Sequence, residues 1–98
     1  MDIRIQAIHF DASEKLVSFI NKKIERLARH NVNISDADVT LKVVKPETAM
    51  NKEALIKVVA PQHEDIVATK TADTFEEAID LAIEAIDRQL DKKKAKKI

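Results

Sequence analysis

The chain has 98 residues, 45% of them hydrophobic and 35% charged, and its 17 basic and 17 acidic residues give a formal net charge of zero. This length predicts one domain with a modest core, and no apolar run approaches the ~20 residues that cross a bilayer. The absence of cysteine excludes disulfides, and the absence of glycine excludes a glycine-rich phosphate loop. Because Met1-Asp2-Ile3-Arg4 does not have the layout of an export signal, we expect a cytoplasmic protein without a membrane partner.

The first third of the chain predicts a strand and then a helix. Apolar and polar residues alternate from Asp2 to Ala7, which is the period of a half-buried strand. Asp11 or Ser13 stands where a helix N-cap is expected. The apolar positions that follow at helical spacing are Leu16, Ile20, Ile24 and Leu27. Residues 31–37 are rich in turn-forming residues and predict a loop.

Three strands are predicted in the middle of the chain. The first covers residues 39–44 and stops at Pro46, the second covers residues 54–59, and the third covers residues 66–71. The sequence leaves two orientations open for the last of these strands. The inward-facing residues are either Ile66 and Ala68 or Val67 and Thr69.

A long helix completes the pattern, capped by Asp73 or Thr74. Its apolar positions are Phe75, Ile79, Ile83, Ile86 and Leu90. The predicted order is therefore β-α-β-β-β-α, in which three consecutive strands with short loops form an antiparallel meander. We expect a two-layer α+β sandwich, with two helices on one face of a four-stranded sheet. This single domain would cover residues 1–91, and residues 92–98 would be a lysine-rich extension of the last helix.

The sheet face opposite the helices is expected to mix charged and apolar side chains. Its predicted residues are Arg4, Thr40, Lys42, Val44, Leu55, Lys57 and Val59. An exposed patch of Val44, Leu55 and Val59 would suit a protein partner. The sequence therefore leaves open an alternative function, a homodimeric interaction module that uses this open face.

The charges of the last helix are separated along its length. Residues 73–84 contain five acidic residues and no basic one, whereas residues 85–98 contain six basic residues and two acidic ones. The helix dipole favours this gradient. It does not explain the sorting around the helix, which places an acidic flank on one side and Arg88, Lys92 and Lys96 on the back and the other side.

The first helix carries a basic flank. At about 100° per residue, four cations fall within a sector of about 60°, with no acidic residue among them. These cations are Lys15, Lys22, Arg26 and Arg29. A plain solvated helix face is one explanation, and a surface that binds nucleic acid is the other, because phosphates respond to local charge rather than to the average over a protein.

Catalytic chemistry has little support in the sequence. His9, His30 and His63 lie on separate predicted edges or loops, so no set of metal ligands converges. Ser13 has no base near it in the sequence, and the carboxylates of the last helix lie on an open face, where their chemistry stays ordinary. We therefore predict no enzyme activity, no catalytic residue, no metal, no cofactor and no small-molecule substrate.

Several short motifs, taken together in order and spacing, resemble the ribosome hibernation-promoting factors, also called ribosome-associated inhibitors, in their short form. The motifs are Ile3-x-Ile5, the helix positions Leu16, Phe19, Ile20, Lys23 and Leu27, the run Val39-Thr40-Leu41-Lys42-Val43-x-Lys45, the strand Ala54-x-Ile56-x-Val58, and Ala78-Ile79-Asp80 followed by Arg88-Gln89-Leu90-x-Lys92-x-Lys94. The resemblance extends from residue 1 to about residue 96.

The resemblance implies a fold similar to double-stranded-RNA-binding domains. It also implies binding to rRNA of the small ribosomal subunit in the channel of mRNA and tRNA, which silences translation in stressed or stationary cells. The rRNA contacts it implies are Lys23, Arg26, Lys42, Arg88, Lys92 and Lys94, and the basic flanks add Lys22, Arg29 and Lys96. This sequence departs from the family pattern at Ala85, where a lysine is usual.

Overall fold

A computed structural model describes residues 2–30, 34–44, 49–60 and 65–95, with side chains as far as Asp91. The elements are β1 (Asp2–Ala7), α1 (Glu14–His30), β2 (Asp36–Val43), β3 (Lys52–Val59), β4 (Ile66–Ala72) and α2 (Phe75–Ala95). The predicted order β-α-β-β-β-α is therefore confirmed. α2 continues to Ala95, and residues 96–98 lie outside the described part of the chain, so the expected domain boundary after residue 91 stays a prediction.

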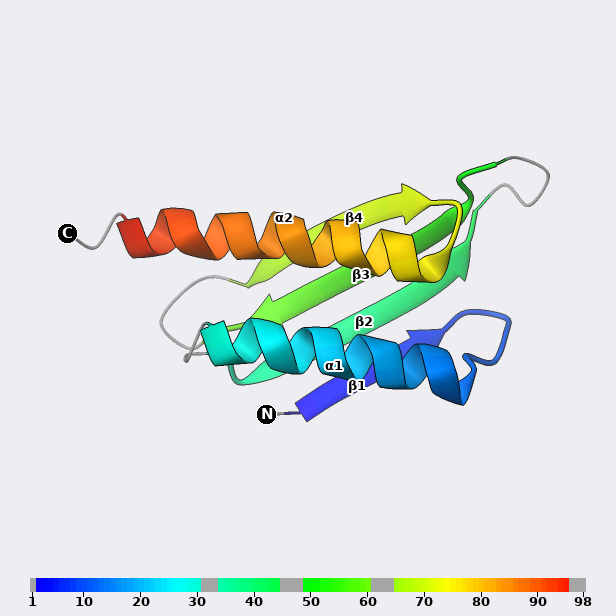
Figure 1. Ribbon diagram of the computed structural model, residues 1–98, viewed down its shortest axis with the longest axis horizontal. Helices are drawn as coiled ribbons and strands as arrows, with labels where there is room; N and C mark the ends of the chain where they lie inside the picture. The colour runs from blue at the N-terminus through cyan, green and yellow to red at the C-terminus, as the bar shows by residue number, and fades with distance from the viewer. Residues whose placement is uncertain (1, 31–33, 45–48, 61–64, 96–98) are drawn as a thin grey trace.

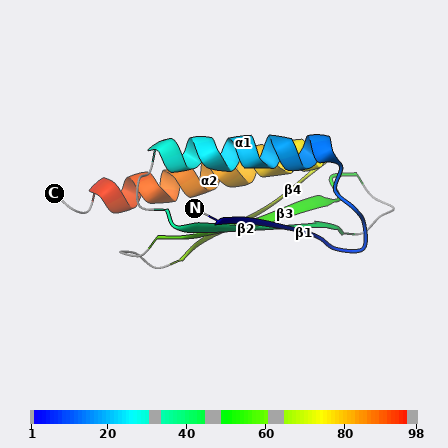
Figure 2. The same cartoon turned by 90° about the horizontal axis from the view of Figure 1, so that it is seen from below.

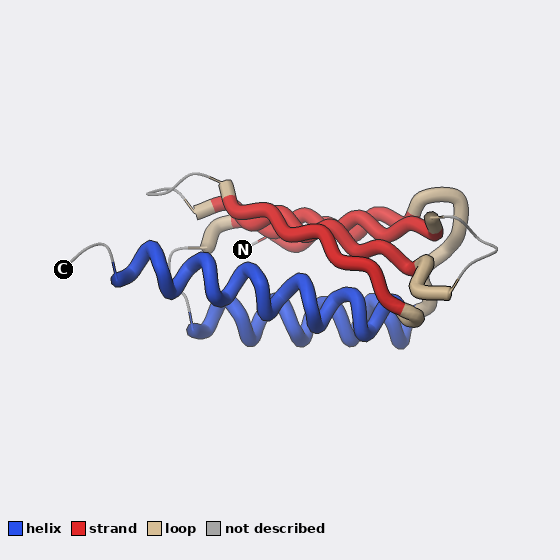
Figure 3. Tube along the Cα trace, turned by 90° about the horizontal axis from the view of Figure 1, so that it is seen from above, coloured by secondary structure: helices blue, strands red, loops and turns tan. Residues whose placement is uncertain are grey.

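The four strands form one sheet in the order β1-β2-β3-β4 (Figure 1). β1 pairs in parallel with β2, and the pairs β2–β3 and β3–β4 are antiparallel, as the predicted meander requires. Both helices lie on the same face of this sheet, which leaves the other face open (Figures 2 and 3). The two-layer α+β sandwich is thus confirmed.

The core fills the space between the helices and the sheet. Its largest fully buried side chains are Ile20, Ile24, Val39, Leu41, Ile56, Val58, Ile66, Ile79 and Ile86. The packing also decides the orientation of β4, because Ile66 and Ala68 are buried whereas Val67 is 46% exposed. α2 packs over β3 and β4, so the apolar residues of β4 that face this helix lose their contact with water.

Short polar side chains set the start of each helix. The Ser13 hydroxyl accepts a hydrogen bond from the Leu16 amide at 3.1 Å, and the Thr74 hydroxyl accepts one from the Glu77 amide at 3.1 Å. Asp73, the other candidate cap of α2, instead accepts a hydrogen bond from the Met50 amide at 2.7 Å. Each helix therefore begins directly after its capping hydroxyl, α1 after Ser13 and α2 after Thr74.

The predicted loop over residues 31–37 was too long. β2 begins at Asp36, within the predicted loop, and its next polar residue, Asp38, is paired with Arg4 of β1. The prediction was wrong because polar residues at alternate positions of β2 face the open side of the sheet, where water satisfies them. Within the described residues, left-handed backbone without glycine occurs in connections at His9 (φ 64°) and Met50 (φ 55°).

Candidate nucleic-acid interface

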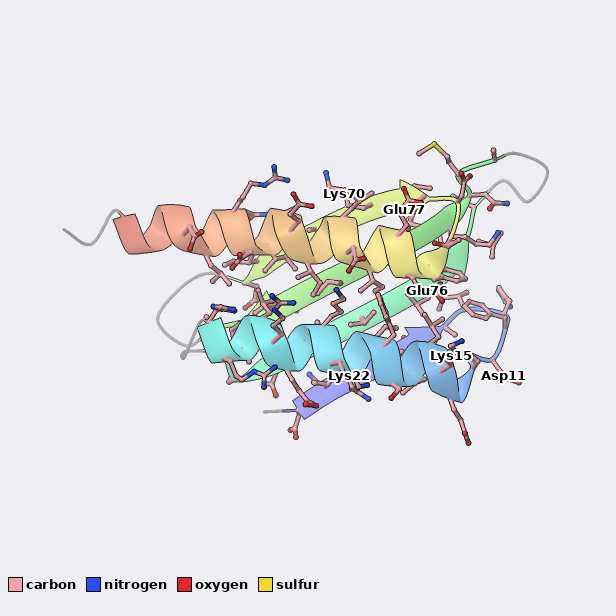
Figure 4. All side chains as sticks on the ribbon, in the orientation of Figure 1. Asp11, Lys15, Lys22, Lys70, Glu76 and Glu77 are labelled. Atoms are coloured by element: carbon pink, nitrogen blue, oxygen red, sulfur yellow. The ribbon has the colours of Figure 1, made fainter. Side chains whose placement is uncertain are left out.

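The side of α1 opposite the core carries a row of exposed cations. Because Leu16, Ile20, Ile24 and Leu27 are buried, the residues about half a turn away face solvent. The outer flank of α1, as we call this row, consists of Lys15, Lys22, Arg26 and Arg29, all of them exposed. The side chain of Lys22 lies on the side of α1 away from α2 (Figure 4).

Local helix chemistry explains only part of the outer flank. Arg29 lies in the last turn of α1, where a cation stabilises the helix dipole by about 0.3–1 kcal/mol. Lys15 lies in the first turn, where the same dipole disfavours a cation, and Lys22 lies in the middle. None of these four cations takes part in the ion pairs Arg4–Asp38, Lys23–Asp80 or Lys57–Asp65. The outer flank is therefore a cationic surface open to a ligand.

Lys23, a predicted rRNA contact, points elsewhere. Its ammonium lies 3.0 Å from a carboxylate oxygen of Asp80 in α2, and 5.4 Å from the centre of the Phe19 ring. The side chain of Lys23 is 33% exposed and that of Asp80 is 50% exposed. Lys23 therefore already has an anionic partner within the protein, and a phosphate that binds this ammonium has to compete with Asp80.

A groove runs between the two helices, and its two walls have opposite charge. The residues of α1 that line this interhelical groove are Lys23, Arg26, Leu27 and His30, and those of α2 are Asp80, Ile83, Glu84 and Asp87. We call Asp80, Glu84 and Asp87 the acidic wall. Arg26 belongs both to the groove and to the outer flank, so the cations of α1 meet the acidic wall at this residue.

Arg88, the basic residue of α2 whose side chain the structure describes, lies beyond the acidic wall as seen from α1. Arg88 is exposed, and it projects about 80° around the helix from Asp80. Lys92 and Lys94 are on the same helix, but their side chains lie outside the described part of the structure, as does the whole of Lys96. The two helices end at the same end of the molecule (Figure 1). An acidic strip therefore separates the basic side of α2 from the outer flank of α1.

Lys42 is not brought together with the helix cations. It is exposed on β2, at a position that alternates with the buried Leu41 and therefore faces the open side of the sheet. Glu53 is its direct cross-strand partner in the register of β2 and β3. The candidate contacts whose side chains the structure describes thus occupy two faces of the protein, with Lys42 on the open sheet face and the others on the helix layer.

Arg4 and Lys57, two cations of the open sheet face, each have an anionic partner. Arg4 donates two hydrogen bonds to the carboxylate of Asp38, the second of them at 3.3 Å, and the Lys57 ammonium lies 3.4 Å from Asp65. The hydrogen bond from Arg4 lowers the pKa of the Asp38 carboxyl below its ordinary value of 3.8. This pairing leaves little unbalanced charge for a ligand on this face.

The apolar residues of the open face do not form one continuous patch. Leu55 is half-buried, and its cross-strand neighbours are Thr40 and Thr69. Val59 is half-buried opposite Asp36. Polar side chains therefore separate the apolar ones, so the geometry gives no support to the alternative of a dimer held by this face.

Metal and membrane chemistry find no support in the described structure. Among the residues that it describes, no three His, Cys, Asp or Glu side chains are grouped as metal ligands would be. Neither described helix combines the length and the apolar character that crossing a bilayer demands. His63 lies outside the described residues, so its predicted place on a loop stays a prediction.

Sequence reasoning identified the cations of this site but missed their acidic neighbours. The sorting of α2 into an acidic and a basic side was visible in the sequence, yet the direction of the acidic side was not. His30 was set aside as a metal ligand, and in the structure it lines the interhelical groove. Ala85, where a lysine was expected, is half-buried against the core, so this position contributes packing.

Comparison with known proteins identifies the family. Residues 3–98 match the family described as Sigma 54 modulation protein / S30EA ribosomal protein. A protein named ribosome hibernation promoting factor, from Azotobacter vinelandii, is 31% identical over 102 residues, a match that covers 100% of this chain and 87% of that protein.

Solved structures agree on the fold. A ribosomal subunit interface protein from Coxiella burnetii has a TM-score of 0.85 and 25% sequence identity, over 97% of this chain and 99% of that one. The N-terminal domain of Protein Y from Thermus thermophilus has a TM-score of 0.76 and 22% identity, over 92% of this chain and 96% of that one, and it supports the fold alone. Because the family match extends from residue 3 to the last residue, the chain belongs to the Sigma 54 modulation protein / S30EA ribosomal protein family, the family of ribosome hibernation factors.

Proposed function

We propose that this protein binds the small ribosomal subunit, occupies the channel of mRNA and tRNA, and thereby holds ribosomes in an inactive state. Two relatives support a ribosomal role by their names, the hibernation promoting factor of Azotobacter vinelandii and the ribosomal subunit interface protein of Coxiella burnetii. The inhibition requires no chemistry, because a folded domain in the channel excludes tRNA and mRNA by its volume.

The outer flank of α1 is the observation that carries this proposal. Four exposed cations lie on one side of a helix of 17 residues, and the helix is held rigidly by its buried stripe. Folded rRNA presents phosphates at fixed spacing, and cations at fixed spacing on a rigid helix neutralise several of them without ordering a flexible segment. The outer flank is therefore suited to a structured RNA surface.

The mode of recognition follows from the composition. The chain has no tyrosine and no tryptophan, and its three phenylalanines include Phe10 and Phe75, which stack on each other with ring centres 5.1 Å apart. Few aromatic faces are left for stacking against splayed bases. We therefore expect charge and shape, and not base reading, to determine binding.

The proposed contacts are of two kinds. The outer flank supplies Lys22, Arg26 and Arg29, and α2 supplies Arg88 beyond the acidic wall. The predicted contacts Lys92, Lys94 and Lys96 follow along the chain, with side chains outside the described part of the structure. Lys23 contributes only where RNA displaces Asp80, and Lys42 contributes only where a second RNA surface reaches the open sheet face. A channel that encloses the domain would provide both surfaces.

Co-sedimentation with purified small subunits tests the proposal. We expect binding that weakens steeply as salt rises, because each phosphate contact releases counterions. Lys22→Glu should weaken binding by about ten-fold or more. Lys70→Glu is the matched control, since Lys70 is exposed on β4 and lies beyond α2 from α1 (Figure 4). Affinity that ignores salt, or equal losses in the two variants, would contradict the proposal.

A further inference from the structure

The interhelical groove contains a competitor for RNA. Asp80 holds the Lys23 ammonium at 3.0 Å, and Glu84 and Asp87 line the same groove opposite Arg26 and His30. A phosphate that approaches Lys23 meets these carboxylates at close range, and like charges there repel. Water reaches both partners of the ion pair, so the pair is exchangeable rather than locked.

We propose that the acidic wall of α2, with Asp80 as its main residue, lowers the affinity of the helix layer for RNA in general and so makes the protein selective for the ribosomal surface. This inference rests on the proposed function. Any RNA duplex can reach the outer flank with one row of phosphates. Only a surface shaped to contact the outer flank and Arg88 together compensates for the acidic strip between them.

The ion pair gives the wall a specific mechanism beyond simple repulsion. Lys23 is fixed by two interactions, the contact with Asp80 and the position of its ammonium over the Phe19 ring. While both persist, Lys23 does not add to the outer flank. Removal of the Asp80 charge therefore both releases a cation and removes an anion from the groove.

A pair of matched variants separates this role from a change of net charge. Asp80→Asn and Glu77→Gln each remove one carboxylate from an exposed position of α2. Asp80 faces the groove, whereas Glu77 lies on the side of α2 away from α1 (Figure 4). Affinity is measured for a generic RNA duplex that spans two successive minor grooves, and for purified small subunits, each at low and at physiological salt.

We expect Asp80→Asn to strengthen binding to the generic duplex by about two- to five-fold, within the range of exposed charge pairs. Binding to small subunits should change less, so that the ratio of the two affinities falls. Glu77→Gln should change the affinity for the duplex, and the ratio of the two affinities, by less than Asp80→Asn does. Glu84→Gln should act in the same direction as Asp80→Asn, and it serves as the second variant if the first proves unstable by circular dichroism.

A double-mutant cycle tests the part played by Lys23. In a Lys23→Gln background, Asp80→Asn should lose the part of its effect that comes from the released ammonium and keep the part that comes from removing a carboxylate that repels phosphate. The inference is overturned if Asp80→Asn gains no more than Glu77→Gln, if its gain persists in full without Lys23, or if the wild type has no measurable affinity for the duplex at low salt. A wild type that binds duplex but not ribosomes would instead contradict the proposed function.

Discussion

The helix layer and the open sheet face are both rich in charge, and they arrange it in opposite ways. On the open face the strand registers place Arg4 beside Asp38 and Lys42 beside Glu53, and Lys57 has its partner in Asp65. On the helix layer the cations of α1 occupy an outer flank while the carboxylates of α2 occupy a separate wall. The two faces differ in pattern rather than in the amount of charge.

This difference follows from the geometry of the two kinds of element. Cross-strand neighbours in a sheet are about 4.5–5.5 Å apart, so opposite charges on adjacent strands meet directly. On a helix, residues three and four apart share a side, and a row of like charges can extend along it. The sheet therefore neutralises its charges locally, whereas a helix can keep a row of cations for a ligand.

Removal of two cations from each face tests the comparison most strongly. Arg26→Gln with Arg29→Gln should weaken binding to small subunits by about 10- to 100-fold and reduce the salt slope by about two. Arg4→Gln with Lys57→Gln removes the same charge from the open face and should change affinity by no more than about two-fold. Co-sedimentation at several salt concentrations measures both. Similar losses in the two double variants would show that total charge, and not its arrangement, controls binding.

Single substitutions sharpen the comparison on a smaller scale. Arg88→Gln should weaken ribosome binding by about three- to ten-fold, because Arg88 is an exposed cation outside the acidic wall. Lys42→Gln should cost about two-fold, since Glu53 lies opposite it in the sheet. Equilibrium titration with labelled small subunits gives both values. A larger loss of affinity for Lys42→Gln than for Arg88→Gln would place the main RNA contact on the open sheet face.

The smallest expected effect concerns the open face and acid pH. Because folding lowers the pKa of Asp38, its ion pair stabilises the fold fully above the ordinary value of 3.8, and this contribution is lost as the pH falls through the lower, folded value. Asp38→Asn should therefore lower the melting temperature slightly at pH 7 and have no effect at strongly acid pH. Thermal unfolding followed by circular dichroism measures this, with Arg4→Gln expected to behave alike. A difference that persists in strong acid would rule out the ionised pair as its cause.

Alternation and helical spacing predicted most of the fold correctly. The stripe Leu16, Ile20, Ile24 and Leu27 is buried as expected, and Ala54, Ile56 and Val58 face the core. The errors concern places where local pattern is ambiguous. The local sequence around Asp36 fits both a turn and a strand whose polar side chains face away from the core. Only the pairing of Asp36 with Asp2 and Val59 distinguishes the two.

The candidate site was predictable in its parts but not in its assembly. The cations of α1 and Arg88 were evident from helical spacing, because side-chain direction on one helix follows from the residue number. The partnership of Lys23 with Asp80 was not evident, since the two residues are far apart in the sequence and meet only when the helices pack side by side.

The sequence by itself determined which residues turn inward on each element and which charges share one side of a helix, because both depend on the local periods of 3.6 and 2.0. The tertiary structure alone decided how those sides face one another. The rotation of α2 that buries Ile79, Ile86 and Leu90 directs the acidic wall towards the groove beside α1. Burial of these apolar side chains sets that rotation, and the charges of the groove follow it.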